Sequence, residues 1–335
     1  MTEAKKIGLG IIGCGIIAEE AHLPALERLK DRYTVTALCN RTRPKAEALA
    51  SRLGLGDKDI WQDYKRMLEE APVEAVLICL PIELNFPVSL EAAKHGKHVL
   101  CEKPCGQSKE EARAAVGLSR KYGITYMVAE DCHYETTFVK AADLARTGAI
   151  GKLTVINWNL FRFMETSNKY AKTLWRINHV YPGGYLLDGG VHFVHVLQMV
   201  AGRIASVKAE TVFSGEPQLG KVDTAFALLR HESGVLSSLN MSWRAKDQPG
   251  HLLKIFGTGG SLIVVDGKIT RISPDGKEEE IPFINENGYY LELADFHRAV
   301  TRGEPPDITA ESAAHDVEVI LAILESAEKG GAVRL

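Results

Sequence analysis

The sequence of 335 residues has no uninterrupted apolar run near the roughly 20 residues that a membrane-spanning helix needs. It also lacks an excess of either charge: the net charge is −3, which gives no electrostatic reason to expect nucleic acid or an acidic membrane surface as a partner. The first residues do not show the basic-then-apolar layout and cleavage site of a signal peptide. We therefore expect a cytoplasmic protein.

Cysteine is scarce as well, with six residues, and four of them, Cys14, Cys39, Cys79 and Cys101, lie in or just after predicted strands. Strand-end cysteines are usually small buried hydrophobic residues. Cys101 and Cys105 flank a turn, so their spacing does not indicate a metal pair. A reduced protein without a bound metal is expected.

Apolar residues make up 45% and charged residues 25%, which are globular values, and the length is sufficient for two domains. The first 130 residues alternate between short apolar strands and helices. Strands are predicted at 6–12, 34–39, 75–80, 98–101 and 124–129, and helices at 16–29, 44–53, 84–95 and 108–122. This alternation predicts an α/β fold with a doubly wound parallel sheet, a Rossmann domain, over 1–130.

The pattern changes near residue 130. Longer strands follow at 152–163, 204–213, 222–230, 235–243 and 251–256, with helices near 135–146, 289–302 and 310–329. We predict an α+β domain over 131–335 with a large, open, mostly antiparallel sheet that binds substrate and mediates oligomerisation.

The strand 152–163 has apolar side chains on both faces, whereas a sheet with one face in water alternates more cleanly. Val155, Phe161 and Phe163 fall on one face, and Ile156 and Trp158 fall on the other with Leu160. We expect one face to pack on helices and part of the other to meet a second subunit in a homodimer or homotetramer.

A glycine-rich turn follows the first strand and opens the first helix: Gly13 and Gly15 are followed by Ile16, Ile17 and Ala18 in a G-x-G-x-x-A pattern. The first glycine permits a tight turn, the second lets a pyrophosphate approach the backbone, and the alanine allows close helix packing. Helix N–H groups would then face the phosphates. The pattern in this place predicts a dinucleotide site.

The end of the second strand is where a carboxylate would bind the adenine ribose and repel a 2′-phosphate. Asn40 stands there instead, followed by Arg41 and Arg43. We predict that NADP is preferred and that NAD can also bind, although the arginines could simply be solvated.

The segment Glu102-Lys103-Pro104, reached through Gly96-Lys97-His98-Val99, resembles the glucose–fructose oxidoreductase / inositol dehydrogenase (Gfo/Idh/MocA) family. The resemblance covers nearly the whole chain. Other matching segments are 13–18, 22–26, 129–131, 148–151, 183–192 and 291–296.

The resemblance implies that Lys103, Asp188 and His192 form the catalytic set. A histidine suits a general acid or base near neutral pH, and a lysine stabilises a developing alkoxide. The four-residue spacing of Asp188 and His192 suits a shared helical face. The resemblance also implies a rigid Lys103–Pro104 peptide that can adopt the cis form. Further cofactor contacts are expected at Leu80, Pro81, Asn85, Glu102, Lys103 and Asp131. Substrate contacts are expected at Lys103, Tyr134, Arg162, Trp175, Arg176, His179, Tyr185, Asp188, His192 and His195.

The chain departs from the family pattern at three positions. His195 replaces a usual aspartate, so a carboxylate that often fixes the substrate or the histidine is missing, and His195 could couple to the titration of His192. Asn85 replaces a common histidine, and Asp131 replaces a common asparagine near the nicotinamide. These changes leave the hydride chemistry intact and leave the substrate open.

The pattern favours a dehydrogenase or reductase that acts on a sugar, sugar derivative or polyol. One alternative is a redox-assisted lyase or glycosidase with a tightly held, recycled cofactor. Another is a cofactor-sensing regulator, against which the retention of the catalytic set argues. A metal site of Asp188, His192 and His195 is a less favoured alternative.

Overall fold

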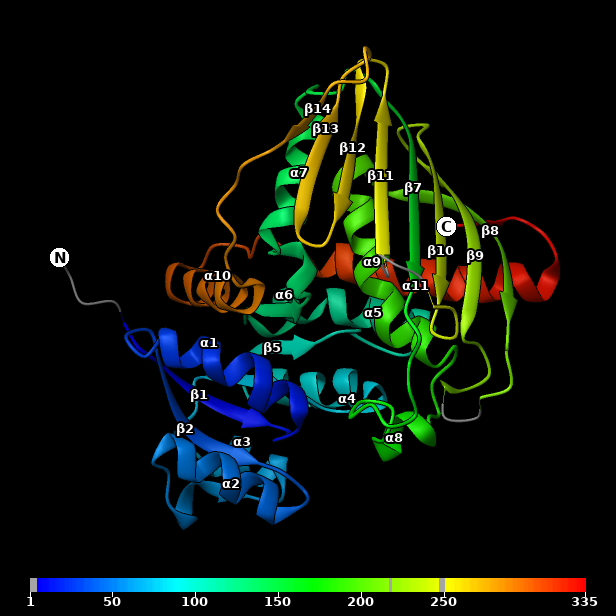
Figure 1. The fold of residues 1–335 in the computed structure, drawn as a ribbon. Helices are drawn as coiled ribbons and strands as arrows, with labels where there is room; N and C mark the ends of the chain where they lie inside the picture. The colour runs from blue at the N-terminus through cyan, green and yellow to red at the C-terminus, as the bar shows by residue number, and fades with distance from the viewer. Residues whose placement is uncertain (1–4, 217–218, 247–250) are drawn as a thin grey trace. The chain divides into compact units, whose positions relative to one another are not determined.

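The computed structural model describes residues 5–216, 219–246 and 251–335 (Figure 1). The chain forms two compact units. The first comprises the residues up to Asp131 together with Asn287–Ala314, and the second comprises Cys132–Glu286 together with His315–Leu335. In the described ranges, no helix is long and apolar enough to cross a membrane.

The first unit contains a six-stranded parallel sheet in the order β3-β2-β1-β4-β5-β6, which confirms the predicted doubly wound fold. The strands are β1 (Ile7–Ile12), β2 (Tyr33–Cys39), β3 (Ile60–Trp61), β4 (Ala75–Ile78), β5 (His98–Glu102) and β6 (Tyr126–Ala129). Their continuous apolar sequences are buried because helices cover both faces of the sheet.

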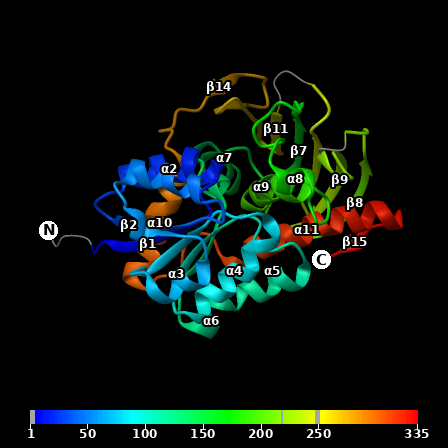
Figure 2. The ribbon, with the colours of Figure 1, turned by 90° about the horizontal axis from the view of Figure 1, so that it is seen from below.

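The helices of this unit are η1 (Ala18–His22, a π-helix), α1 (Leu23–Arg28), α2 (Arg43–Leu53), η2 (Asp57–Asp59), α3 (Tyr64–Glu70), α4 (Ile82–Lys94), α5 (Lys109–Val116), α6 (Leu118–Tyr122), η3 (Asp131–His133) and α10 (Gly288–Arg302). In Figure 2, α2 and α10 lie on one side of the sheet and α3, α4 and α6 lie on the other. The strand β3 and the helix α3 were not predicted, because neither is long enough to show a clear hydrophobic period.

The first unit includes α10, which the sequence analysis placed in the 131–335 domain. Two contacts explain this. The Tyr33 hydroxyl donates to the Leu293 carbonyl at 2.6 Å, and the Arg28 guanidinium lies 3.9 Å from the centre of the Tyr290 ring. The helix is distant in sequence but packs on α1 and β2, so a single boundary near 130 does not describe the units.

The second unit contains a nine-stranded sheet in the order β14-β13-β12-β11-β7-β10-β9-β8-β15. The pair β7 and β10 is parallel and the other neighbouring strands are antiparallel, which confirms a mostly antiparallel sheet. The strands are β7 (Leu153–Phe161), β8 (Ile204–Val212), β9 (Thr224–His231), β10 (Leu236–Ser242), β11 (His251–Gly257), β12 (Gly260–Val265), β13 (Lys268–Ile272), β14 (Glu278–Glu280) and β15 (Val333–Arg334).

The helices of the second unit are α7 (Thr136–Arg146), α8 (Leu174–Ile177), α9 (Tyr185–Ala201) and most of α11 (Ala310–Lys329). Trp158, from the predicted buried face of β7, contacts Phe138 of α7 and Phe193 of α9, with ring centres 5.6 Å and 5.3 Å apart. One face of β7 therefore packs on helices, as the two-faced apolar pattern predicted.

A carboxyl group lies inside the first unit. Glu292 of α10 is 0% exposed, and neither of its carboxyl oxygens has a hydrogen-bond partner in the described part of the chain. Burial raises the pKa of Glu292 well above its ordinary value, and the nearby carboxyl groups of Glu102, Asp131, Glu130 and Asp295 add to the effect. The folded state therefore favours the protonated acid.

We predict that Glu292→Gln stabilises the protein increasingly as the pH rises above the ordinary glutamate pKa of 4.5. In that range the unfolded chain has released the proton and the folded chain retains it, so wild-type stability falls by up to about 1.4 kcal/mol per pH unit from this group. Urea unfolding of both proteins from pH 5 to pH 8 measures the difference.

Glu74→Gln is the matched control, because a hydrogen bond from Lys5 lowers the pKa of Glu74. Its stability difference should run in the opposite direction and stay small, since the pair is exposed. A difference between Glu292→Gln and wild type that does not change with pH would contradict an acid held protonated.

Candidate active site

The turn after β1 requires glycine at its first position. Gly13 has a φ of +101°, and a Cβ there would lie 2.1 Å from the Cys79 carbonyl oxygen. A Cβ at Gly15 would meet no described atom within 4 Å. The backbone at Gly15 is therefore open to a ligand, and Ile16 and Ile17 begin a helix whose first N–H groups have no partner within the helix. These features fit a dinucleotide pyrophosphate.

Asn40 at the end of β2 holds this turn in place. Its Oδ1 accepts from the Cys14 N–H at 3.1 Å, and its Nδ2 donates to the Thr42 carbonyl at 2.8 Å. The side chain thus links the glycine turn to the loop that carries the arginines.

The two arginines of that loop differ. The Arg41 side chain is exposed, whereas Arg43 Nε donates to Glu47 at 2.8 Å and its Nη2 donates to Asp57. The salt bridge between Arg43 and Glu47 spans one turn of α2. Arg41 is therefore the guanidinium better placed to meet a phosphate.

Asn85 of α4 has a structural role that the sequence did not reveal. It is fully buried, and its Nδ2 donates to the carbonyl oxygens of Glu102 and Pro104, both at 2.9 Å. Its amide hydrogens fix the segment around Lys103 and are not available to a cofactor or substrate oxygen. The expectation that Asn85 contacts the cofactor through its amide hydrogens is therefore wrong. Leu80 and Pro81 precede α4 and are both partly exposed.

The segment at the end of β5 is held from a second side. The Glu102 carboxylate lies 2.7 Å from His22 Nε2, and both side chains are buried. The His22 ring also packs edge-on against Tyr289 of α10, with ring centres 5.1 Å apart. Lys103, between these anchors, is partly exposed, and the Lys103–Pro104 peptide is cis, as the resemblance implied.

His22 was recognised in the sequence only as part of a matching segment. Its partner Glu102 lies 80 positions away, so no local pattern could have paired them. The sequence showed only that His22 precedes Pro24 near the start of a helix, which does not indicate its partner.

Asp188 of α9 forms a buried ion pair with Arg176, whose Nε lies 2.6 Å from the carboxylate. The guanidinium carbon lies 4.0 Å from the centre of the Trp175 ring and 5.2 Å from that of Tyr170. Burial disfavours the arginine cation, but Asp188 outweighs this effect and the pKa of Arg176 is raised. Arg176 therefore holds the Asp188 carboxylate in place.

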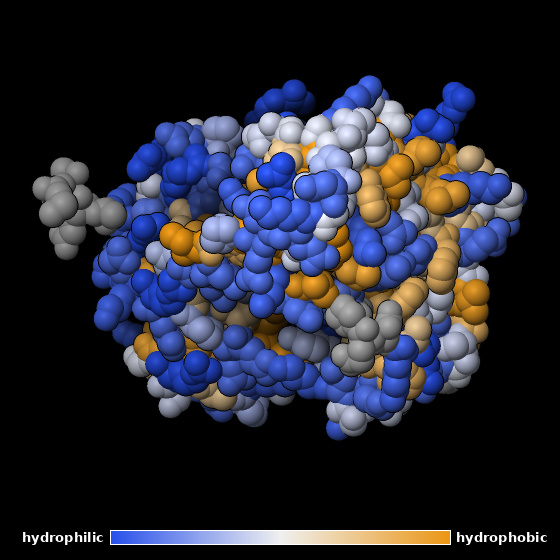
Figure 3. Space-filling view, turned by 45° about the horizontal axis from the view of Figure 1, so that its top comes forward, coloured by the Kyte–Doolittle hydropathy of each residue, from blue (hydrophilic) through white to orange (hydrophobic). Residues whose placement is uncertain are grey.

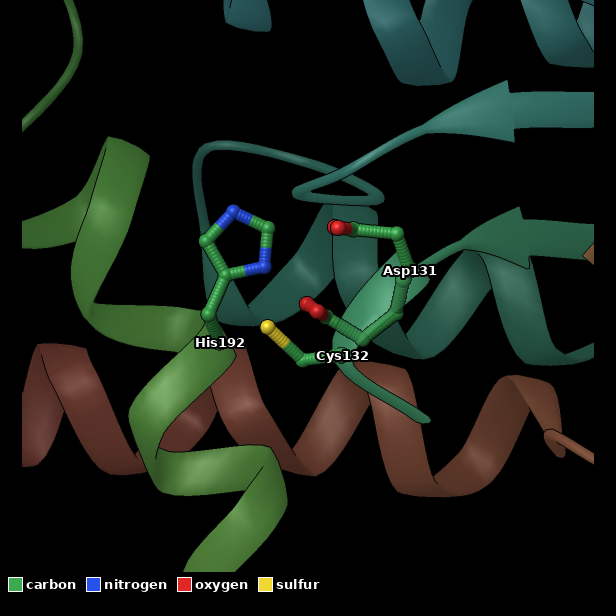
Figure 4. A group of neighbouring side chains, drawn as sticks. Asp131, Cys132 and His192 are labelled. Atoms are coloured by element: carbon green, nitrogen blue, oxygen red, sulfur yellow. The ribbon is translucent and has the colours of Figure 1, made fainter. Parts of the chain in front are cut away.

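His192 lies one turn after Asp188 on α9 and is partly exposed. Figure 4 shows its ring beside Cys132, and the Cys132 Sγ and a ring nitrogen of His192 lie within 4.8 Å of each other. Asp131, at the start of η3, is partly exposed. Lys103 belongs to the first unit, and Asp188 and His192 belong to the second.

His195 does not have the surface position that a substrate contact would need. It is 2% exposed, and its two ring nitrogens lie 2.7 Å from Asp316 Oδ2 and 2.8 Å from His133 Nδ1. Asp188 and His195 of α9 therefore have different partners. Asp316 lies 121 positions from His195, so no local sequence pattern pairs the two, and the same holds for His133.

Several other predicted substrate residues lie near the start of α9. Tyr185 is buried with a hydroxyl that has no hydrogen-bond partner among the described residues, and burial raises its pKa to about 12. His179 Nδ1 lies 3.0 Å from the Arg176 carbonyl oxygen, and Trp175 is partly exposed.

The remaining two predicted substrate residues lie elsewhere in the second unit. Arg162 is exposed just beyond β7. Tyr134 is buried, with its ring centre 4.9 Å from that of His133.

Two models of one protein family match this chain. Residues 7–130 match the oxidoreductase family with an NAD-binding Rossmann fold, and residues 138–263 match the GFO/IDH/MocA C-terminal domain. The chain belongs to the Gfo/Idh/MocA family of oxidoreductases. It therefore has an NAD-binding Rossmann domain and is an enzyme of the dehydrogenase and reductase type.

Individual relatives of this Gfo/Idh/MocA protein extend over the whole chain. The solved structure of an oxidoreductase from Thermotoga maritima is 35% identical with a TM-score of 0.90, and the match covers 98% of each chain. The D-xylose 1-dehydrogenase (NADP(+)) 2 of Haloferax volcanii is 27% identical, over 97% of this chain and 99% of that protein. The myo-inositol 2-dehydrogenase of Thermotoga maritima is 24% identical, over 98% of each.

Proposed function

We propose that this protein transfers a hydride between a nicotinamide dinucleotide and a CH–OH carbon of a sugar, sugar derivative or polyol. The main support for the proposal is that Lys103 lies on a segment held by both His22 and Asn85. Asp188 and His192 lie one turn apart on α9. Relatives named for D-xylose and myo-inositol support the substrate class.

The roles of the side chains follow from their chemistry. The bound nicotinamide supplies the hydride acceptor or donor. In the oxidative direction His192 takes the proton from the substrate hydroxyl, and the Lys103 ammonium stabilises the alkoxide charge that develops. Asp188, which is held by its ion pair with Arg176, lies one turn before His192 on α9.

The catalytic set generates a direct test. Lys103→Ala and His192→Ala should each lower kcat by roughly 10²–10⁴-fold, the range expected for charge-stabilising and general acid–base groups. Turnover is followed by the absorbance of the reduced nicotinamide during a screen of sugars and polyols. His192→Ala should still bind the dinucleotide.

Lys94→Ala is the matched control, because Lys94 lies on α4 and pairs with Glu91 on an exposed surface. It should retain wild-type turnover. Near-wild-type turnover in both Lys103→Ala and His192→Ala would refute the assignment.

We propose further that NADP binds more tightly than NAD. Position 40 carries no acid that would repel a 2′-phosphate, and Arg41 is exposed at the strand end. A guanidinium can bind a phosphate with two charge-assisted hydrogen bonds, each worth about 1.5–3 kcal/mol. One good contact corresponds to roughly ten- to a hundredfold in affinity.

Calorimetric titration of each cofactor tests this preference. Arg41→Ala should reduce the preference for NADP, whereas Arg43→Ala should reduce it less, because the Arg43 guanidinium is already paired with Glu47 and Asp57. Equal affinities of the wild type for the two cofactors, or tighter binding of NAD, would show that Arg41 does not bind the phosphate.

We also propose that the outer face of the second unit's sheet mediates a homodimer or homotetramer. Exposed apolar side chains lie there in register: Val155 of β7 is paired with Leu236 of β10 and with Phe256 of β11. Phe226 and Leu228 of β9 add to this face. Figure 3 shows apolar side chains at the surface on the side where β8, β9 and β10 lie in Figure 1. Exposed apolar patches of this kind mark association surfaces.

Light scattering at micromolar concentration measures the assembly. Leu228→Glu should shift the mass towards a single chain, because it places a charge in the proposed interface. Ile284→Glu introduces the same charge at an exposed position outside the strands and should leave the mass unchanged. A wild-type mass of one chain would contradict the proposal.

A cytoplasmic location is part of the same proposal. All six cysteines are buried thiols. Burial raises the pKa of Cys14, Cys39 and Cys101 to about 12, which keeps them in the unreactive thiol form. Such cysteines suit a reducing compartment.

A further inference from the structure

A hydrogen-bonded array crosses the second unit beneath His192. His195 lies one turn after His192 on α9, and its Nδ1 is 2.7 Å from Asp316 Oδ2 on α11. Its Nε2 is 2.8 Å from His133 Nδ1. The other Asp316 oxygen accepts from Gln198 Nε2 at 2.7 Å, so both carboxylate oxygens have donors.

The partners restrict where the protons lie. An ionised Asp316 accepts only, so His195 carries its hydrogen on Nδ1. In neutral His195 the Nε2 is then an acceptor, and His133 must donate through its Nδ1. One further proton can enter this chain on His133 Nε2, or move to His195 with a matching change of the His133 tautomer. Hydrogen-bonded groups that share a proton in this way are expected to titrate as one unit.

The array lies alongside the proposed general base. Cys132 and His133 are consecutive residues, and they contact His192 and His195, which are one turn apart on α9. Residues three apart on a helix are neighbours on its surface. Figure 4 shows the Cys132 side of this pairing. We therefore expect a change of charge in the array to change the pKa of His192.

The array is largely buried. His195 and Asp316 are each 2% exposed, and the Tyr134 ring packs edge-on against His133. The next residue on α11, His315, faces away from the array: its Nδ1 lies 3.3 Å from Glu318 and its Nε2 lies 2.8 Å from the Ile204 carbonyl oxygen. Cys132 and His192 are ionisable groups on the same two elements as His133 and His195, and the acidic residues Glu130 and Asp131 immediately precede Cys132 in the chain.

We propose that Asp316, His195 and His133 form a proton-holding array that replaces the carboxylate missing at position 195 and controls the charge beside His192. Asp316 and His195 are positioning residues in this account, and His133 is a second titrating imidazole. The inference rests on the proposed role of His192 as the general base. The negative charge is that of Asp316 on α11. The His195 imidazole links it by hydrogen bonds to His133 of η3.

Histidine NMR titration of the full-length protein tests the array without any substrate. In the wild type, His133 and His195 should share the same titration midpoints. Asp316→Asn should shift both to lower pH, because the carboxylate that favours their protonation is gone. Glu318→Gln is the matched control, because it removes the carboxylate that pairs with His315 on the same helix. It should leave the titration midpoints of His133 and His195 unchanged. Independent titration of His133 and His195 in the wild type would overturn the proposal.

The pH dependence of kcat/KM tests the coupling to His192. Asp316→Asn should shift the acidic limb of the profile and lower kcat/KM by roughly tenfold at neutral pH, less than the loss of the general base itself. His195→Asp combined with Asp316→Asn returns one carboxylate next to His133 and should restore the profile, whereas His195→Phe should not. A structural role alone would lower thermal stability in these variants and leave the profile unchanged, which would overturn the coupling.

The two experiments separate this inference from the proposed function. If the wild type turns over no sugar or polyol, the proposed function fails while the NMR titration still decides whether the array exists. If turnover depends on His192 but the Asp316 variants keep the wild-type profile, the proposed function stands and the array has no part in it.

Discussion

Two buried side chains anchor the segment that carries Lys103, the lysine of the proposed catalytic set. His22 binds the Glu102 carboxylate on one side of Lys103, and Asn85 donates to the backbone carbonyls on the other. Because these groups are buried, breaking either contact would leave polar atoms without partners at a high free-energy cost. Buried polar contacts on both sides thus hold the backbone that carries Lys103.

In the second unit, the buried polar residues of α9 also have partners on other elements, and each has different ones. Asp188 pairs with Arg176, and His195 joins Asp316 and His133. His192, between them, is the partly exposed member of the three. A helix so rich in buried polar groups is stable only because the surrounding elements satisfy them.

The sequence predicted the parts of this protein that local patterns encode. Continuous apolar strands predicted the parallel sheet, the glycine turn predicted the dinucleotide site, and the two-faced pattern of 152–163 predicted a strand with helices on one side only. Contacts over long sequence distances were missed. Asn85 was expected to face a cofactor but binds the main chain of residues 102 and 104, and Asp316 meets His195 from 121 positions away. The pairing of Arg43 with Glu47 was available from its four-residue spacing.

The late position of α10 in the chain has a consequence for biosynthesis. The first unit needs residues 287–314, whose contacts with Arg28 and Tyr33 close its core. Ribosomes release these residues only after the whole sheet of the second unit has emerged, apart from β15. Although domains generally fold in order from the N-terminus during synthesis, this dinucleotide-binding unit starts first and is completed near the end of translation, with its α1 surface uncovered until then.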